Sequence, residues 1–251
     1  MDDIAQGTRL VIVRHGEAVC NVEEYIGGHA SCKGLTERGV LQARALAERL
    51  ERTGELAGAS AFYTSILPRA IQTAEVLAPV LARSSRGGAA LDLVQTCALC
   101  ERHPGEADGL TWTQYVERYG RRSLPGDVPE EPLSPGGESW AGFLDRAAAA
   151  LGDLARTHPG ELVVVVAHGG VVDASMIRLL DLADHGAGVR LHPHHTSMTE
   201  WQHTGAKWRL VRYNDAAHLL EVGPAPRAGG LLSAPPEWVV ADPGVTASQQ
   251  E

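Results

Sequence analysis

The feature that most constrains this chain is a short apolar run that stops abruptly at charged residues. Leu10-Val11-Ile12-Val13 is followed at once by Arg14-His15-Gly16-Glu17. The length and β-branched content of the run predict a buried strand, and open α/β sheets bind ligands where such strands end. An arginine fork can hold phosphate oxygens while a neutral imidazole nitrogen attacks phosphorus, so the pair indicates phosphoryl chemistry. By itself, an Arg-His pair at a strand end also fits an ordinary surface contact.

Two more strand ends repeat this arrangement. The apolar residues 162–167 predict a second strand, which ends in His168-Gly169-Gly170 before a helical pattern over residues 171–180. Residues 62–64 predict a third strand, with Ser65 as the N-cap of the next helix and Arg69 in its first turn. A helix N-terminus itself attracts anions, and a cation beside it adds to that attraction. The three strand ends together predict one anion-binding site.

Further motifs accompany these strand ends in a fixed order, from about residue 8 to residue 219. They are Arg14-His15-Gly16-Glu17 with Asn21, Gly34-Leu35-Thr36-Glu37-Arg38-Gly39, Ser65-Ile66-Leu67-Pro68-Arg69-Ala70-Ile71-Gln72-Thr73-Ala74, Glu101-Arg102-His103, Pro135-Gly136-Gly137-Glu138-Ser139, Val166-Ala167-His168-Gly169-Gly170, and Asn214-Asp215 before His218-Leu219. In these motifs the chain resembles the histidine phosphatase superfamily, also called the phosphoglycerate mutase-like family. The resemblance implies a three-layer α/β/α sandwich with a mostly parallel central sheet.

The length of 251 residues suits one α/β domain of this kind. We expect the domain to cover residues 1–219, with residues 110–135 as an insertion that sets substrate specificity. Residues 220–251 are rich in Pro, Gly and Ala and predict a loosely attached tail. Within the domain we expect a helix that begins after Thr36, with Leu41, Ala45, Leu46 and Leu50 on its buried face. A helix over residues 138–157 and late strands over residues 198–202 and 208–213 are also predicted.

The chemical roles follow from the residue types. His15 is the expected nucleophile and forms a phosphohistidine, while Arg14, Arg69 and His168 counter the charge on the transferred phosphoryl group. The resemblance adds Asn21, the backbone at Gly28 and Ser31, and Gly169 as further phosphate contacts, and Glu17 as a residue that orients an arginine. No metal and no cofactor are expected, because the cations take the place of magnesium.

The leaving group needs a proton, and Glu101 is the expected donor. In the family the acid lies in a Leu-x-Glu segment, which Leu99-Cys100-Glu101 matches. Glu106 and Asp108 are the rival candidates, and an ion pair with Arg102 is the structural alternative for Glu101. Six other histidines are expected at the surface or in hydrogen bonds, namely His103, His192, His194, His195, His203 and His218.

The sequence favours a phosphatase over a mutase. Glu101-Arg102-His103 resembles the mutase segment, and Arg121 and Arg122 resemble the arginine pair with which mutases bind the substrate carboxylate. However, Leu110 is followed by Thr111 and Trp112, where mutases carry a lysine. We therefore expect a metal-independent phosphomonoester hydrolase that acts on a small phosphorylated metabolite. A phosphoglycerate mutase-type phosphotransferase, a phosphoprotein phosphatase and a non-catalytic phospho-ligand binding module stay as alternatives.

The formal net charge of −9 argues against binding to nucleic acid or to an anionic membrane. The first residues lack the basic and apolar parts of a signal peptide, so a cytoplasmic location is expected. The expected partner is a small phosphorylated substrate, and a homo-oligomer is compatible with the sequence. Cys97 and Cys100 have the spacing of a redox or half-zinc motif, but Cys20 and Cys32 form no second pair of this kind. Reduced, partly buried thiols are expected instead.

Overall fold

A computed structural model describes residues 7–88, 91–120, 128–182, 191–205 and 207–223 of the chain. Its centre is a six-stranded sheet with the strand order β3-β2-β4-β1-β5-β6. The first four strands along the chain run parallel to one another. β5 pairs antiparallel with β1, and β6 pairs antiparallel with β5. The strands are β1 Thr8–Arg14, β2 Ala59–Thr64, β3 Leu93–Gln95, β4 Leu162–Ala167, β5 Met198–Thr204 and β6 Lys207–Asp215.

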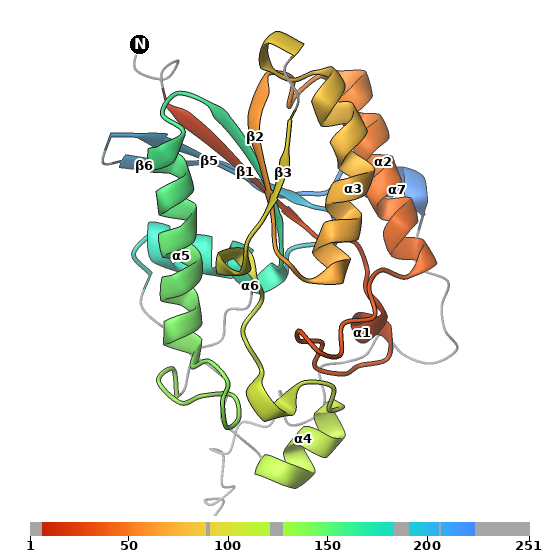
Figure 1. Cartoon of the computed structure of the whole chain (residues 1–251), viewed down its shortest axis with the longest axis vertical. Coiled ribbons are helices and arrows are strands. Elements are labelled where there is room, and N and C mark those ends of the chain that lie inside the picture. The colour runs from red at the N-terminus through yellow and green to blue at the C-terminus, as the bar shows by residue number, and fades with distance from the viewer. Residues whose placement is uncertain (1–6, 89–90, 121–127, 183–190, 206, 224–251) are drawn as a thin grey trace, which may run out of the picture.

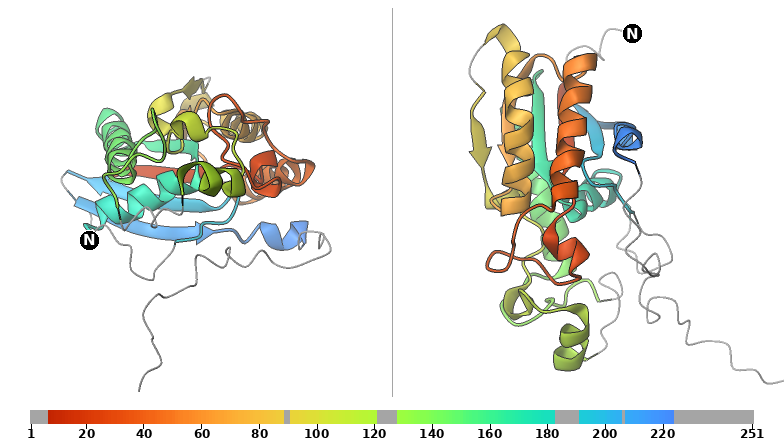
Figure 2. Two further views of the ribbon diagram at one scale, coloured as in Figure 1. Left: turned by 90° about the horizontal axis from the view of Figure 1, so that it is seen from below. Right: turned by 90° about the vertical axis from the view of Figure 1, so that its right-hand side faces the viewer.

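Helices cover both faces of this sheet (Figures 1 and 2), so the expected three-layer α/β/α sandwich with a mostly parallel sheet is confirmed. The helices are α1 Val19–Val22, α2 Glu37–Thr53, α3 Pro68–Arg83, α4 Trp112–Tyr119, α5 Trp140–Thr157, α6 Gly169–Leu179 and α7 Leu219–Val222. Alternate residues of β1 enter two separate cores. Leu10 and Ile12 pack under α5 and α6, and Val11 and Val13 pack under α2 and α3. The apolar run is therefore buried on both faces, as expected of a central parallel strand.

The helix α2 shows where the sequence pattern was right and where it failed. Thr36 is its N-cap, as predicted, because the Thr36 side chain accepts a hydrogen bond from the Gly39 amide. Leu41 was predicted on the buried face but is 53% exposed. The polar Gln42 is buried instead and accepts a hydrogen bond from the Glu17 amide. The loop after β1 requires a hydrogen-bond acceptor at this place, so α2 buries Gln42 and exposes Leu41.

The later elements agree with the predictions apart from their ends. The two predicted late strands are β5 and β6, and α5 begins at Trp140 with Ser139 as its N-cap. Part of the expected specificity insertion forms α4, whose Tyr115 packs against Ile26 and Ala107. The chain beyond residue 219 continues into α7, and the Arg38 guanidinium donates to the Gly223 carbonyl. Residues 224–251 of the expected tail lie outside the described residues, and the division into domain and tail stays a prediction.

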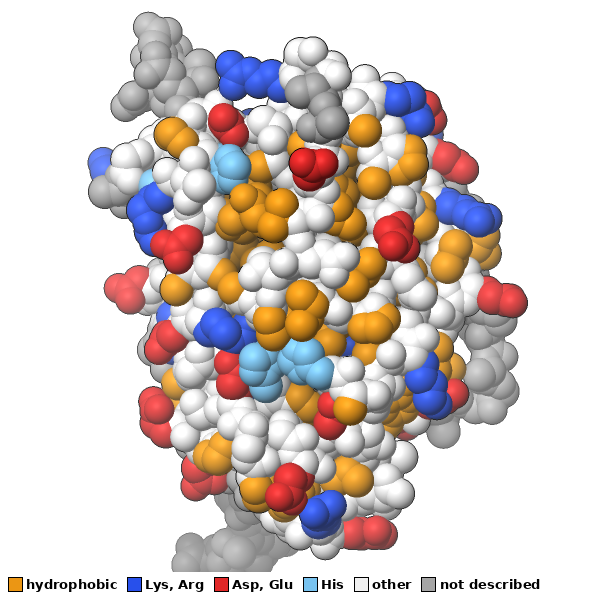
Figure 3. Space-filling view, in the orientation of Figure 1, with side chains coloured by type: hydrophobic (Ala, Val, Ile, Leu, Met, Phe, Trp, Pro, Cys, Tyr) orange, Lys and Arg blue, Asp and Glu red, His pale blue; other side chains and the backbone are white. Residues whose placement is uncertain are grey.

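The surface of the described part is mixed in charge. Acidic and basic side chains are interspersed on the face seen in Figure 3. No described helix is long and apolar enough to cross a bilayer.

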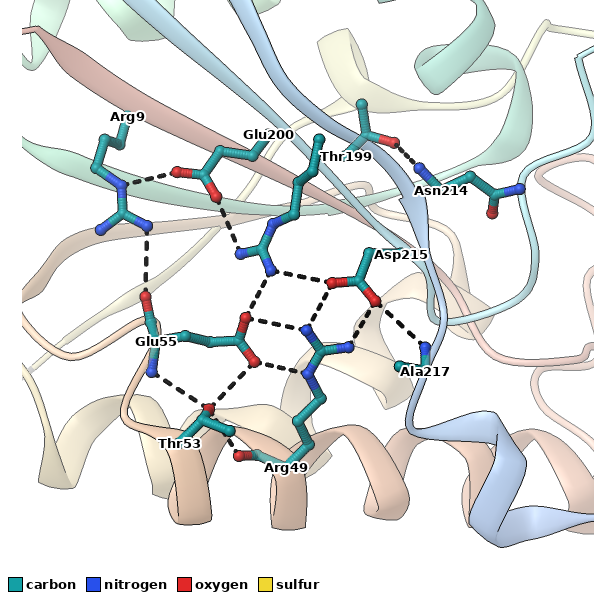
Figure 4. Close-up of polar contacts among 10 residues, drawn as sticks. Arg9, Arg49, Thr53, Glu55, Thr199, Glu200, Asn214, Asp215 and Ala217 are labelled. Carbon is teal, nitrogen blue, oxygen red and sulfur yellow. Dashed lines mark hydrogen bonds and ion pairs between the residues drawn. The ribbon is translucent and has the colours of Figure 1, made fainter. Parts of the chain in front are cut away.

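A network of ion pairs fastens β6 to the end of α2 and to the loop that follows it (Figure 4). The guanidinium of Arg49 contacts Glu55 at 2.7 Å and Asp215 at 2.6 Å. These charges are only partly exposed, which limits screening by solvent. Hydrogen bonds from Arg49 lower the pKa of Asp215, although burial opposes the shift. The members of the network are Arg9, Arg49, Glu55, Glu200, Arg212 and Asp215.

Asp215→Asn should lower the free energy of unfolding by about 2 kcal/mol at pH 7, because it removes a charged partner from two arginines. The folded-state pKa of Asp215 is lowered, so its contribution is complete above the usual aspartate pKa and is lost as the pH falls below it. The difference between wild type and variant in urea unfolding should therefore shrink as the pH is lowered from 6 to 3. Asp153→Asn is the matched control, because the Asp153–Arg156 pair is 72% and 62% exposed and should change stability by less than about 0.5 kcal/mol. Equal effects of the two substitutions would contradict this account of the network.

Candidate active site

The carboxyl ends of the parallel strands bring the predicted site residues together. His15 follows β1, Ser65 follows β2 and His168 follows β4. The backbone continues the sheet at these positions, since the His15 amide donates to the Ala167 carbonyl at 2.9 Å. The Ser65 amide likewise donates to the Val166 carbonyl at 3.1 Å. The sheet therefore fixes where these side chains begin.

His15 is held as a neutral imidazole with a defined tautomer. Its side chain is buried, and Nδ1 lies 2.6 Å from the Gly16 carbonyl oxygen. A carbonyl only accepts, so Nδ1 carries the proton and Nε2 keeps its lone pair. Burial, together with the nearby charge of Arg69, lowers the pKa of His15 well below its usual value. His15 can therefore act as a nucleophile through Nε2 across the neutral pH range.

Arg69 points at that nucleophilic nitrogen. It is only 3% exposed, and its Nε donates to His15 Nε2 at 3.2 Å while Nη1 donates to the Gly27 carbonyl at 3.0 Å. Arg69 does lie in the first turn of α3, as predicted, but the prediction of Ser65 as the N-cap was wrong. The N-cap is Leu67, because Pro68 occupies the first helical position, where its missing amide proton costs nothing.

His168 faces His15 across the site. The centroids of their rings are 5.1 Å apart, and His168 Nε2 lies 2.8 Å from Ser65 Oγ. Its Nδ1 is buried and has no hydrogen-bond partner among the described residues. Burial and the charge of Arg69 lower the pKa of His168 well below its usual value. A phosphoryl oxygen beside Nδ1 would satisfy this ring as a hydrogen-bond acceptor.

Arg14 completes the cationic side of the site. Its Nη1 donates to the Pro193 carbonyl, and its Nε is buried without a partner among the described residues. The guanidinium lies against Gly169, where an added Cβ would come within 3.4 Å of Arg14 Nε. Gly169 opens α6, so its backbone lies at a helix N-terminus that favours anions. Four predicted groups, Arg14, His15, Arg69 and His168, thus lie together at the carboxyl ends of β1 and β4.

Glu101 lies at the edge of this group. Its carboxylate accepts hydrogen bonds from the Arg102 amide at 3.0 Å and from the Gly170 amide at 3.1 Å. A Cβ at Gly170 would collide with Glu101 Oε1, so glycine there lets the carboxyl approach the start of α6. The Arg102 guanidinium donates to the carbonyl of Glu138. Glu101 is therefore oriented by backbone amides next to His168 and Gly169.

The rival acids are engaged elsewhere. Asp108 accepts hydrogen bonds from the amides of Gly28 and Ala30, both at 2.9 Å, and from the Ser31 hydroxyl. Burial alone would raise the pKa of Asp108, but these hydrogen bonds outweigh it and lower the pKa, so Asp108 has no proton to give at neutral pH. Glu106 pairs with Arg118 at the surface. Of the three acids, Glu101 is the one that contacts the start of α6, next to His168.

Several residues that the family resemblance suggested have other contacts. The Gly28 amide is bound to Asp108, and the Asn21 side chain accepts a hydrogen bond from the Ala18 amide. Glu17 accepts a hydrogen bond from the Thr36 hydroxyl and lies 3.9 Å from the Nε of Arg38. The roles of Gly28 and Asn21 in phosphate binding, and of Glu17 in orienting an arginine, stay predictions. Arg121 and Arg122 lie outside the described residues.

The sequence did not reveal two partly buried groups of the site, Asp173 and His195. His195 was expected at the surface or in a hydrogen bond, but its ring lies 5.8 Å from that of His15, and burial lowers its pKa to about 2. Its Nε2 has no partner among the described residues. Burial, with the charge of Glu101, raises the pKa of Asp173 to about 7, and the charge of Arg14 opposes the shift. The pairing of β5 with β1 brings His195 to the site, and no local pattern announces that pairing.

Comparison with known proteins agrees with this geometry. The histidine phosphatase superfamily (branch 1) model matches residues 10–216. A metal-independent phosphoserine phosphatase from Arabidopsis thaliana is 33% identical over 218 residues, which cover 86% of this chain and 85% of that protein. A 2,3-bisphosphoglycerate-dependent phosphoglycerate mutase from Leifsonia xyli subsp. xyli is 31% identical over 205 residues, which cover 70% of this chain and 78% of that protein. The solved structure of a mycobacterial glucosyl-3-phosphoglycerate phosphatase superposes with a TM-score of 0.67 at 27% identity, and the match covers 82% of this chain and 99% of that one.

The chain belongs to the histidine phosphatase superfamily. Within that family it is a phosphoric monoester hydrolase, in keeping with its phosphatase relatives.

Proposed function

We propose that this enzyme hydrolyses a small phosphorylated metabolite through a phosphohistidine formed at Nε2 of His15. The observation that supports this most is the arrangement of the His15 ring. The Gly16 carbonyl holds the proton on Nδ1, and Arg69 lies at Nε2, where a phosphoryl group would be received. A histidine with a merely structural role does not need an unprotonated Nε2 held next to Arg14, Arg69 and His168.

The first step is an in-line attack of His15 Nε2 on phosphorus, which breaks the bond to the ester oxygen. Arg14, Arg69 and His168 stabilise the charge on the equatorial oxygens, and the loss of one such contact costs about a hundredfold to a thousandfold in rate. Glu101 gives a proton to the leaving alkoxide. In the second step Glu101 takes a proton from water, which attacks the phosphohistidine and releases inorganic phosphate and free His15.

The proposed substrate class is a small phosphate monoester that carries polar or anionic groups. Relatives named for phosphoserine and for glucosyl-3-phosphoglycerate support this class. A mutase reaction is less well supported. Mutases carry a lysine soon after the residue that matches Leu110, whereas here Thr111 follows Leu110 and serves as the N-cap of α4. A mutase needs enough clamps to retain a bisphosphorylated intermediate and exclude water.

A panel of phosphate esters, assayed without added divalent cations, tests the proposal. It should include phosphoserine, 3-phosphoglycerate, glucosyl-3-phosphoglycerate, a sugar phosphate and a serine-phosphorylated peptide. We expect release of inorganic phosphate from at least one small ester at a kcat/KM well above that for the peptide. Conversion of 3-phosphoglycerate to 2-phosphoglycerate, stimulated by 2,3-bisphosphoglycerate and without phosphate release, would instead identify a mutase. Preference for the peptide would identify a phosphoprotein phosphatase.

A further inference from the structure

Four side chains with metal-binding atoms gather beside the active site. His29 comes from the loop after α1, and the other three, Cys97, Cys100 and His103, come from the segment after β3. One potential ligand atom from each lies within 4.8 Å of all the others. The arrangement therefore joins two segments that are far apart in the sequence.

Two of the distances between these atoms are close to those of a tetrahedral zinc site. Cys97 Sγ lies 3.3 Å from His29 Nε2 and 3.4 Å from His103 Nε2. Zinc bonds of about 2.3 Å to sulfur and about 2.1 Å to nitrogen, at tetrahedral angles, place these two atoms about 3.6 Å apart. A shift of a few tenths of an ångström would bring the two imidazole nitrogens to this distance from Cys97 Sγ.

The backbone that carries the two cysteines is rigidly built. Residues Cys97–Leu99 form a 3₁₀ turn, and the Thr96 hydroxyl accepts a hydrogen bond from the Ala98 amide at its start. The Arg146 guanidinium donates to the carbonyls of Cys97, Ala98 and Cys100. Two cysteines separated by two residues on such a turn are a common pair of zinc ligands.

The groups around the ligands also suit a metal. The Glu138 carboxylate lies 3.7 Å from Nδ1 of His103 and is itself fixed by Arg146 at 2.7 Å. A carboxylate beside Nδ1 favours the tautomer whose Nε2 is free to bind a metal. The Ser65 hydroxyl oxygen lies 3.3 Å from Cys100 Sγ. His103 therefore has a neighbour that would support its coordination to a metal.

We propose that His29, Cys97, Cys100 and His103 bind one zinc ion. Two thiolates and two neutral imidazoles balance the charge of Zn²⁺, and binding releases the two thiol protons to solvent. Four protein ligands leave no open position, so the metal has a structural role and takes no part in phosphoryl transfer. It would tie the loop that carries His29 to the segment that carries Glu101.

A tetrahedral zinc site needs four ligands, and Cys20 and Cys32 form no second cysteine pair that could join Cys97 and Cys100. The fold supplies two histidines instead. The histidines are accessible, because His29 is exposed and His103 is partly exposed. Histidine side chains also lie together at the surface near the middle of the face seen in Figure 3. An ion could therefore enter from solvent.

Metal content measures the proposal directly. The protein is produced with added zinc under reducing conditions and dialysed against metal-free buffer. Inductively coupled plasma mass spectrometry should then find one zinc ion per chain. His29→Ala and Cys97→Ala should lose most of this zinc, and His29→Ala is the variant least able to harm folding because its side chain is exposed. His203→Ala, a change beside the amino end of β1 and so at the opposite end of that strand from the active site, should keep the full zinc content. Wild type without zinc, a disulfide between Cys97 and Cys100 in its place, or equal zinc in wild type and His29→Ala would overturn the proposal.

Two further readouts do not depend on catalysis. Cobalt bound in place of zinc should give the intense visible bands of a tetrahedral site and thiolate charge-transfer absorption, and Cys97→Ala should lose both. Zinc should raise the Tm of the metal-free wild type by about 5 °C or more but leave that of His29→Ala unchanged. His15→Ala should bind zinc as wild type does, so failure of the metal proposal and failure of the phosphohistidine proposal are distinguishable. Octahedral cobalt spectra, or a zinc-induced rise in Tm that persists in His29→Ala, would place the metal elsewhere.

Discussion

His15→Ala should abolish turnover of every phosphate ester that the enzyme accepts, with a loss in kcat on the order of 10⁵-fold. The substitution removes Nε2 of His15, the nitrogen proposed to attack phosphorus. Arg14, Arg69 and His168 remain, so the folded variant should still bind inorganic phosphate or vanadate. Steady-state kinetics with the best ester of the panel and calorimetric titration with phosphate measure the two effects separately.

His203→Ala is the control for this experiment, because it removes a histidine that pairs with Thr8 at the amino end of β1, the end opposite to His15. Its kcat should stay within about twofold of wild type. If His15→Ala retained substantial activity while it bound phosphate normally, a different group would be the nucleophile.

Glu101→Gln should slow phosphoryl transfer from an alkyl phosphate by about a hundredfold or more, and transfer from p-nitrophenyl phosphate much less. A sugar or serine alkoxide is strongly basic and needs a proton as it leaves, whereas nitrophenolate is stable without one. The comparison requires single-turnover formation of phosphohistidine, because the same change also impairs the later attack by water. Glutamine keeps the size of the side chain, and its carbonyl oxygen can keep one of the two hydrogen bonds that the carboxylate oxygens accept from the Arg102 and Gly170 amides.

Asp108→Asn provides the matched comparison. Asp108 is ionised and held by the Gly28 and Ala30 amides, so its loss should change the two esters to the same extent. A leaving-group-dependent loss in Asp108→Asn would reassign the acid to Asp108. Equal slowing of both esters in Glu101→Gln would indicate that Glu101 binds substrate without donating a proton.

The strand ends were predictable because they depend on local patterns. Apolar runs that stop at Arg14-His15 and at His168 specify both the strand and the residue it presents, and the family motifs added Glu101. The start of α3 was less predictable, because Pro68 competes with Ser65 to define the first turn. Leu41 shows the same limit, since a buried hydrogen bond of Gln42 decided which face of α2 turned inward.

Groups that meet only through long-range pairing could not be found from the sequence. His195 reaches His15 because Thr196 donates from its amide to the Arg14 carbonyl, in a backbone conformation with a positive φ of 57°. Asp173 lies inside an apolar helical pattern that suggests only packing. His29 and Cys97 are neighbours because the loop after α1 meets the end of β3. In each case the sequence shows the residue but not its partner.

The central claim is that His15 carries the phosphoryl group, and rapid quenching tests it most directly. Wild-type enzyme mixed with a ³²P-labelled ester and quenched in base within the first turnover should hold label that is stable to alkali and labile to acid. Mass spectrometry of the digested protein should place this phosphate on His15, and Glu101→Gln should accumulate more of it when an aryl ester is used. Label on serine or aspartate, or release of phosphate in the first turnover without any label on the protein, would contradict the account.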